Sequence, residues 1–154
     1  MQARFLTIAV ALATLGASLA ALPAGAQNTD PIKQRQELMK ENGRSAKGAG
    51  EMIKGEAAFD PATAATIFTE MHDVAMEFGE YFPEDSKTGE DTEAAPAIWE
   101  RPAEFQAALV KFQEDTQAAI DAAPQDVEAF RQAFGRVAEN CKGCHEEFRI
   151  DKDG

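Results

Sequence analysis

Hydrophobic residues recur through most of the chain at intervals of three, four and seven, the periodicity of one face of an α-helix. Strand-like alternation of apolar and polar residues appears nowhere after residue 26. Prolines and glycines interrupt the helical pattern, so the sequence predicts four helices, over residues 31–54, 61–82, 98–122 and 125–149. Four helices with mostly short connections predict an all-α fold, an antiparallel up-down-up-down four-helix bundle.

Local residues predict where these helices begin and end. Asp30 is the expected N-cap of the first helix and Gly55 its end, and Pro83 ends the second helix. We expect the third helix to accept Pro102, because the first turn of a helix has no internal hydrogen bond to lose. The polar connection 84–95 contains few apolar residues and is predicted to be the mobile part of the chain.

Each predicted helix has an inward stripe. In the first helix Ile32, Met39, Ala46 and Ile53 lie seven residues apart, which puts them on one face. The fourth helix has the most regular stripe, and this stripe contains both cysteines of the chain: Val127, Phe130, Phe134, Val137, Cys141, Cys144 and Phe148. Both cysteines are therefore predicted to face the core.

The first 26 residues are typical of a secretory signal peptide. Arg4 precedes an apolar segment that ends in small residues before Ala26, where we expect cleavage. An uncleaved membrane anchor is the alternative, and nothing later in the sequence is apolar enough to span a membrane. The prediction is a signal peptide over residues 1–26, then one domain over residues 27–154 that is exported to the periplasm.

Acidic residues outnumber basic ones, 27 to 15, for a formal charge of −12. Nucleic-acid binding requires a basic surface, so this composition disfavours it. We expect partners that are neutral or basic, because the acidity is spread over most of the chain. No pair of side chains has the pattern of a catalytic nucleophile and its base, so the sequence does not predict an enzyme.

The chain has two cysteines, and they form the segment Cys141-Lys142-Gly143-Cys144-His145. This is the attachment signature of haem c. On a helix the two thiols project from one side, about one turn apart, where each can bond to the same porphyrin edge. His145 would then be the proximal iron ligand. The sequence therefore predicts a bundle that holds one covalently bound haem c.

Other uses of two such cysteines are less consistent with the chain. A disulfide within the pair is the main alternative, and it would imply a haem-free helical interaction protein. A thioredoxin-like redox pair requires a βαβ context that the helical pattern lacks. A zinc site requires further ligands, and the only other histidine is His72.

The mature chain resembles the class II c-type cytochromes, the cytochrome c prime family. The resemblance rests on the attachment motif near the carboxyl terminus, residues 141–149, on residues 35–44, which are similar to the family's first helix, and on residues 96–99. It covers essentially all of the chain after residue 26, and it implies a four-helix bundle with haem held between helices.

The resemblance also implies that one residue of the first helix, on the distal side of the haem, distinguishes two branches of the family. Most members have a non-coordinating side chain at the distal position of the first helix, and a low-spin branch has methionine there; this sequence has Met39. We expect Met39 to be the second iron ligand, since a thioether pairs with histidine in cytochromes. Methionine in a core is also often filler, and Met71 is a rival ligand. Met52 and Met76 are expected to be packing or surface residues, and His72 to be exposed to solvent.

Three further residues extend the predicted site. Arg35 lies one turn before Met39 and is expected to bind a haem propionate, the alternative being surface pairing with Glu37 or Glu41. Gly43 lies one turn after Met39, and a glycine inside a helix indicates that something bulky approaches closely there or that helices pack tightly. Arg149, four residues after His145, has an analogous place beside the proximal imidazole.

These observations predict a periplasmic electron carrier with low-spin, six-coordinate iron bound by His145 and Met39. The alternative is a five-coordinate, high-spin protein that binds nitric oxide or carbon monoxide at the distal face. The acidic surface predicts redox partners with a basic patch. The resemblance also implies a possible homodimer through the first two helices.

Overall fold

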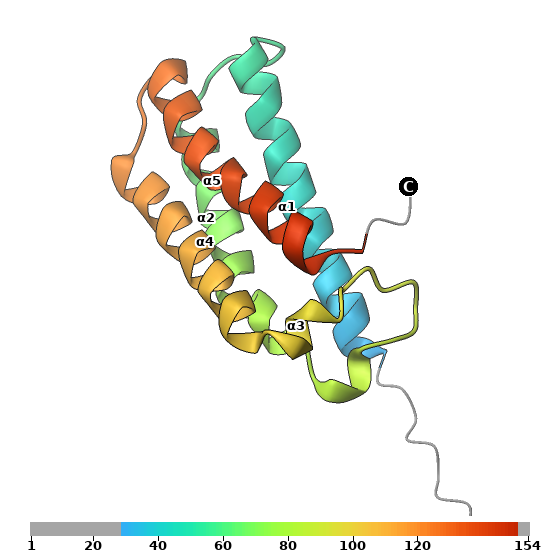
Figure 1. The fold of residues 1–154 in the computed structure, drawn as a ribbon. Coiled ribbons are helices and arrows are strands. Elements are labelled where there is room, and N and C mark those ends of the chain that lie inside the picture. Colours follow the sequence, from blue (N-terminus) through green and yellow to red (C-terminus); the bar gives the residue numbers. More distant parts are fainter. Residues whose placement is uncertain (1–28, 151–154) are drawn as a thin grey trace, which may run out of the picture.

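The computed structural model describes residues 29–150, so the predicted signal peptide and its cleavage site lie outside the described residues. Its α-helices are α1 (Asp30–Lys54), α2 (Pro61–Glu77), α3 (Ala97–Glu100), α4 (Pro102–Ala122) and α5 (Val127–Phe148). The four long helices form an antiparallel bundle in which α1 and α4 each pack against both α2 and α5 (Figure 1). The predicted four-helix bundle is confirmed. Between residues 29 and 150 no helix is long and apolar enough to cross a membrane.

Capping residues explain most of the helix boundaries. Gly55 ends α1 in the left-handed conformation, with φ 76°, as its sequence position predicts. Asp126 caps α5 by accepting a hydrogen bond from the Ala129 N–H at 2.8 Å. The predicted cap of α1 is wrong by one residue, because Asp30 is already helical and Thr29 is the N-cap.

The second and third helices are shorter than predicted. The α-helix α2 ends at Glu77 and continues as a single 3₁₀ segment, η1 (Phe78–Tyr81). The sequence predicts that the third helix continues from residue 98 through Pro102. The helix is instead interrupted at Arg101, which has φ −126° and ψ 56°. The ring of a proline disfavours the helical conformation of the residue before it, so Pro102 begins a new helix, α4.

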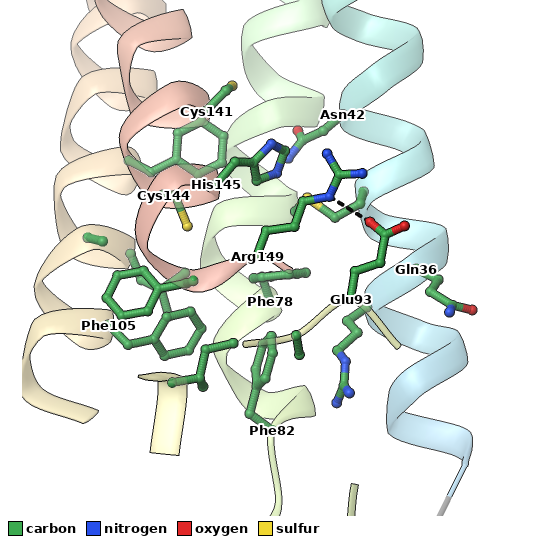
Figure 2. Close-up of a pocket in the computed structure, with 18 of the residues that line it drawn as sticks. Gln36, Asn42, Phe78, Phe82, Glu93, Phe105, Cys141, Cys144, His145 and Arg149 are labelled. Carbon is green, nitrogen blue, oxygen red and sulfur yellow. Dashed lines mark hydrogen bonds and ion pairs between the residues drawn. The ribbon is translucent and has the colours of Figure 1, made fainter. Parts of the chain in front are cut away.

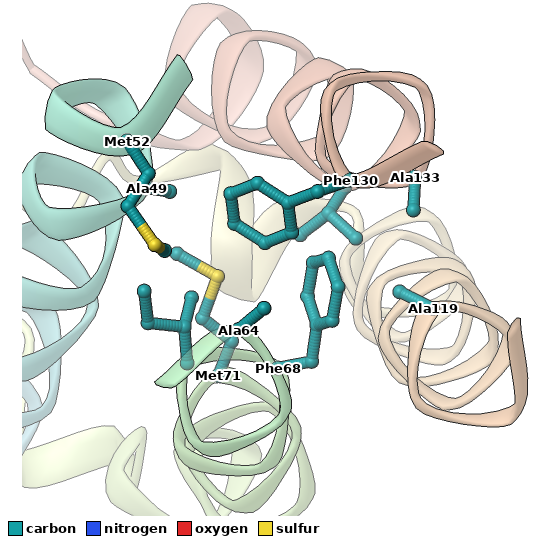
Figure 3. Packing of buried hydrophobic residues seen from close by; sticks show 10 residues of the cluster. Ala49, Met52, Ala64, Phe68, Met71, Ala119, Phe130 and Ala133 are labelled. Atoms are coloured by element: carbon teal, nitrogen blue, oxygen red, sulfur yellow. The ribbon is translucent and has the colours of Figure 1, made fainter. Parts of the chain in front are cut away.

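The core consists of two clusters of buried side chains. The first contains Met52, Phe68, Met71 and Phe130, and Figure 3 shows the rings of Phe68 and Phe130 facing each other between the helices, with centroids 5.2 Å apart. The second is made of buried residues from α3, α4 and α5, with Phe82 packed against it. The first cluster fills one part of the bundle, and the second lies against a cavity described below.

The connection 84–95 contains a short 3₁₀ turn, η2 (Glu84–Ser86). The far end of this connection is hydrogen-bonded to the residues that follow α5. Ala94 and Arg149 form an isolated antiparallel bridge, and the Ile150 N–H donates to the Glu93 carbonyl at 2.7 Å. The segment predicted to be mobile is therefore held against the bundle at this point, where it forms one wall of the cavity.

Candidate haem site

A cavity of about 790 Å³ lies between α1, α4, α5 and the 91–94 segment. Its volume is within the range of cofactor pockets, and much of its wall is aromatic or aliphatic. All the site residues predicted from the sequence line this one cavity: Arg35, Met39, Cys141, Cys144 and His145. Figure 2 shows the cysteines and His145 on α5, with Phe78, Phe82 and Phe105 close to them.

The two cysteines of the motif are free thiols. They are half-buried on the cavity wall and are not joined by a disulfide. Burial raises the pKa of the Cys144 thiol to about 11, with a smaller contribution from Cys141, whose own thiol pKa burial also raises. Both sulfurs are therefore protonated near neutral pH.

The imidazole of His145 projects from the same side of α5 (Figure 2). Partial burial of the ring lowers its pKa, the positive charge of Arg149 lowers it further, and Glu93 acts in the opposite direction. The neutral imidazole, which is the form that binds metal ions, is thereby favoured.

Met39 is the only methionine of residues 29–150 that lines the cavity. Met71 and Met52 are buried in the first core cluster instead, so they pack against other helices. Met76 is 57% exposed. The prediction that His72 is exposed is wrong: it is half-buried, and its Nδ1 lies 3.0 Å from Thr116 Oγ1, away from the cavity.

Two features of α1 fit a bulky group in this cavity. The Oδ1 atom of Asn42, which lines the cavity, is buried without a hydrogen-bond partner. Gly43 also lines the cavity, and a Cβ built there would meet no protein atom within 4 Å, so helix packing does not explain a glycine at this position. Together with the cysteines and His145, these residues fit a porphyrin.

Arg35 is 4% exposed, and both of its terminal nitrogens are already hydrogen-bonded. Nη1 donates to the Tyr81 carbonyl at 2.9 Å and to Ser86 Oγ at 3.0 Å, and Nη2 donates to the Ser86 carbonyl at 2.8 Å and to Thr92 Oγ1 at 2.7 Å. Its guanidinium also lies 4.9 Å from the Phe82 ring centroid. Burial lowers the pKa of Arg35, and a guanidinium nevertheless remains charged at neutral pH.

These contacts differ from the surface pairing that sequence reasoning offered as the alternative for Arg35. Glu37 pairs with Lys40 at 2.5 Å instead. Arg35 therefore joins α1 to the 81–92 segment and places a buried positive charge on the cavity wall. Its pairing with a haem propionate stays a prediction.

Sequence reasoning missed the contribution of Glu93. Its carboxylate accepts a hydrogen bond from Arg149 Nε at 2.6 Å, and both side chains line the cavity beside His145 (Figure 2). Arg149 has the position that its spacing from His145 predicts. The spacing gives no indication of Glu93, which comes from a connection 56 residues earlier and is brought there by the Ala94–Arg149 bridge.

A bundle with a thiol pair and an imidazole on the wall of an apolar cavity defines a c-type cytochrome. The family model described as Cytochrome C' matches residues 30–149, so the chain belongs to the cytochrome c' family. Covalent haem c is the cofactor of this family, and Cys141 and Cys144 are consistent with its attachment site.

Similar proteins agree with this assignment. A cytochrome c' of Rhodopseudomonas palustris is 37% identical over 152 residues, which is 99% of this chain and 99% of the relative. A cytochrome c-556 of Agrobacterium fabrum is 32% identical over 121 residues, covering 79% of this chain and 82% of the relative. A solved structure of cytochrome c' from Rhodopseudomonas palustris superposes with a TM-score of 0.77 at 37% identity, covering 82% of this chain and all of that chain.

Proposed function

We propose that this protein is an electron carrier whose haem c is attached through Cys141 and Cys144 and whose iron is bound by His145 and Met39. The observation that carries the proposal is the position of Met39. It lies on α1 and lines the same cavity as His145 on α5, and the other methionines of the described residues lie elsewhere.

His145 and Met39 would hold the iron, and the cavity wall would surround the haem. Haem c, when bound, supplies an iron centre that gains and loses one electron. With an imidazole and a thioether as its ligands, the iron would change oxidation state with little rearrangement. A methionine ligand also raises the reduction potential, and the aromatic wall of Phe78, Phe82 and Phe105 limits access of water.

The relatives favour a second candidate function. The first relative and the solved structure reported above are both named cytochrome c', and the family resemblance implies that most members have a distal residue that does not coordinate. In that state Met39 would pack beside the distal face, and the cavity would accept nitric oxide or carbon monoxide.

Export to the periplasm follows from the predicted signal peptide over residues 1–26 and belongs to the same proposal. The net charge of −12 favours a redox partner with a basic patch. A homodimer through α1 and α2 is compatible with the proposal and is tested by the molar mass in solution.

The optical spectrum of the reduced haem protein distinguishes the two functions. We expect low-spin bands for the natural protein, and high-spin bands together with carbon monoxide binding for Met39→Ala. Met71→Leu is the matched control, because it replaces a buried methionine outside the cavity and should leave the spectrum unchanged. A high-spin spectrum of the natural protein, or a low-spin spectrum of Met39→Ala, would reject Met39 as ligand and support the gas-binding function.

A further inference from the structure

The acidity of this protein is distributed unevenly over the bundle. Residues 61–122, which include α2 and α4, carry 14 acidic residues and three basic ones. Helix α1 carries six basic residues and four acidic ones. Helices α2 and α4 carry seven of these acidic residues and one of the basic ones, and the other seven acidic residues lie in the connecting segment 78–101. The excess of acidic residues therefore lies outside α1.

The cations of α1 form a stripe on one face of the helix. Charged residues recur at alternating intervals of four and three, which keeps them on a single side. Two of them are acidic, Glu37 and Glu51, and these pair with cations of the same face at 2.5 Å and 3.8 Å. The others form what we call the α1 basic stripe, and all of its members are exposed: Lys33, Lys40, Arg44, Lys47 and Lys54.

The α1 basic stripe reaches the mouth of the cavity at Lys40. The exposed residues among those lining the cavity mark this mouth, and Lys40 is one of them, as are His145 and Arg149. On the opposite side of the mouth Arg149 pairs with Glu93 at 2.6 Å and Lys142 with Glu146 at 3.7 Å, so these two pairs add no net charge. Asp91 also lines the cavity on this side. On the α1 face the pairs of Glu37 and Glu51 leave an excess of three cations.

Screening determines which charges a docking partner experiences. At physiological ionic strength the Debye length is about 8 Å, which is less than the diameter of one helix with its side chains. A protein that approaches the mouth is therefore influenced by the charged residues that border it, and acidic residues farther away than this distance are largely screened. Electron transfer requires close approach to the haem edge, so the local charge at the mouth determines the productive orientation.

We propose that the α1 basic stripe is the docking surface for an acidic patch on a redox partner protein. This inference rests on the proposed electron-carrier function. It differs from the expectation based on net charge alone, because a partner with a basic patch would be attracted to the acidic residues outside α1.

Small redox reagents of opposite charge measure the local potential at the mouth. We expect oxidation of the reduced haem protein by anionic hexacyanoferrate(III) to slow as ionic strength rises, and oxidation by cationic tris(phenanthroline)cobalt(III) not to slow. At low ionic strength the double variant Arg44→Glu/Lys47→Glu should react with hexacyanoferrate roughly tenfold more slowly. The matched control Lys87→Glu/Lys111→Glu makes the same change of charge on residues outside α1, and its rate should stay within about twofold.

A binding measurement without electron transfer provides a second test. Addition of poly-L-glutamate to the reduced ¹⁵N-labelled protein should shift the amide signals of α1, and the Arg44→Glu/Lys47→Glu variant should lose these shifts. If hexacyanoferrate oxidation accelerates with salt, or if poly-L-glutamate shifts no α1 amide, the docking surface is wrong while the electron-carrier function stands. If the haem protein exchanges electrons with neither reagent, the electron-carrier function itself is wrong.

Discussion

Replacing Arg35 with alanine removes the buried cation that ties α1 to the 81–92 segment. The side chain makes four hydrogen bonds of 2.7–3.0 Å to neutral oxygens of Tyr81, Ser86 and Thr92. In the variant the Ser86 and Thr92 oxygens lose these donors, and Ser86 is fully buried. Leaving a buried acceptor without its donor costs about 1–3 kcal/mol. Because more than one acceptor loses its donor here, we expect a loss near the upper end, about 3 kcal/mol.

Urea unfolding of the haem protein, followed by circular dichroism, measures this loss. For a domain of this size it corresponds to a fall in Tm of about 10 °C. Amide hydrogen exchange should show that protection is lost first in the 84–95 connection, since Arg35 holds this segment while the bundle core is unchanged.

Arg44→Ala is the matched control, because Arg44 is an exposed arginine on the same helix. Its effect should stay within about 0.5 kcal/mol. Equal stability of the Arg35→Ala and Arg44→Ala variants would show that the four hydrogen bonds only offset the desolvation of the guanidinium. The assignment of Arg35 as the residue that anchors the connection would then be wrong.

Two further predictions concern acidic residues. Hydrogen bonds from the hydroxyl and backbone N–H of Thr63 hold the pKa of Asp60 below its ordinary value, so its stabilising contribution is present above about pH 4 and is lost as the pH falls. Asp60→Asn keeps a capping side chain without a titrating carboxyl, and its free energy of unfolding in urea should fall less steeply under acid than that of the natural protein; parallel curves would contradict this. Glu93→Gln removes an anion beside the haem cavity, so spectroelectrochemistry should show a higher midpoint potential, with a stability change below about 1 kcal/mol because the pair with Arg149 is partly exposed. Glu114→Gln, on an exposed position of α4 that does not line the cavity, is the control, and a shift of the same size there would contradict a local effect.

The bundle was predictable because the residues that indicate each helix lie within that helix or next to its ends. The stripe from Val127 to Phe148 fixes the inward face of α5, and the same stripe places Cys141 and Cys144 on the cavity wall. Gly55 marks an end that local backbone preferences determine, whereas the α-helix α2 ends at Glu77, six residues before Pro83. These signals act over one or two helical turns, so a single sequence is sufficient to detect them.

The environment of Arg35 was not predictable in this way. Its partners Ser86 and Thr92 are 51 and 57 residues further along the chain, and no periodicity relates such distant positions. The break at Arg101 was missed for a different reason. A proline can lie in the first turn of an existing helix, and it can also begin a new helix. The backbone conformation of the preceding residue decides between these two cases, and the sequence does not give that conformation.

The attachment motif is on α5, which follows the other cavity-forming helices in the chain. A ribosome therefore makes Met39, Phe82 and Phe105 before it makes the cysteines to which haem is joined. Haem can thus be attached only to polypeptides that have been synthesised as far as the motif on α5. A polypeptide that ends within α4 has no attachment site and would not bind haem covalently. Red colour in a preparation of this protein consequently reports completed translation of the domain as well as loading of its cofactor.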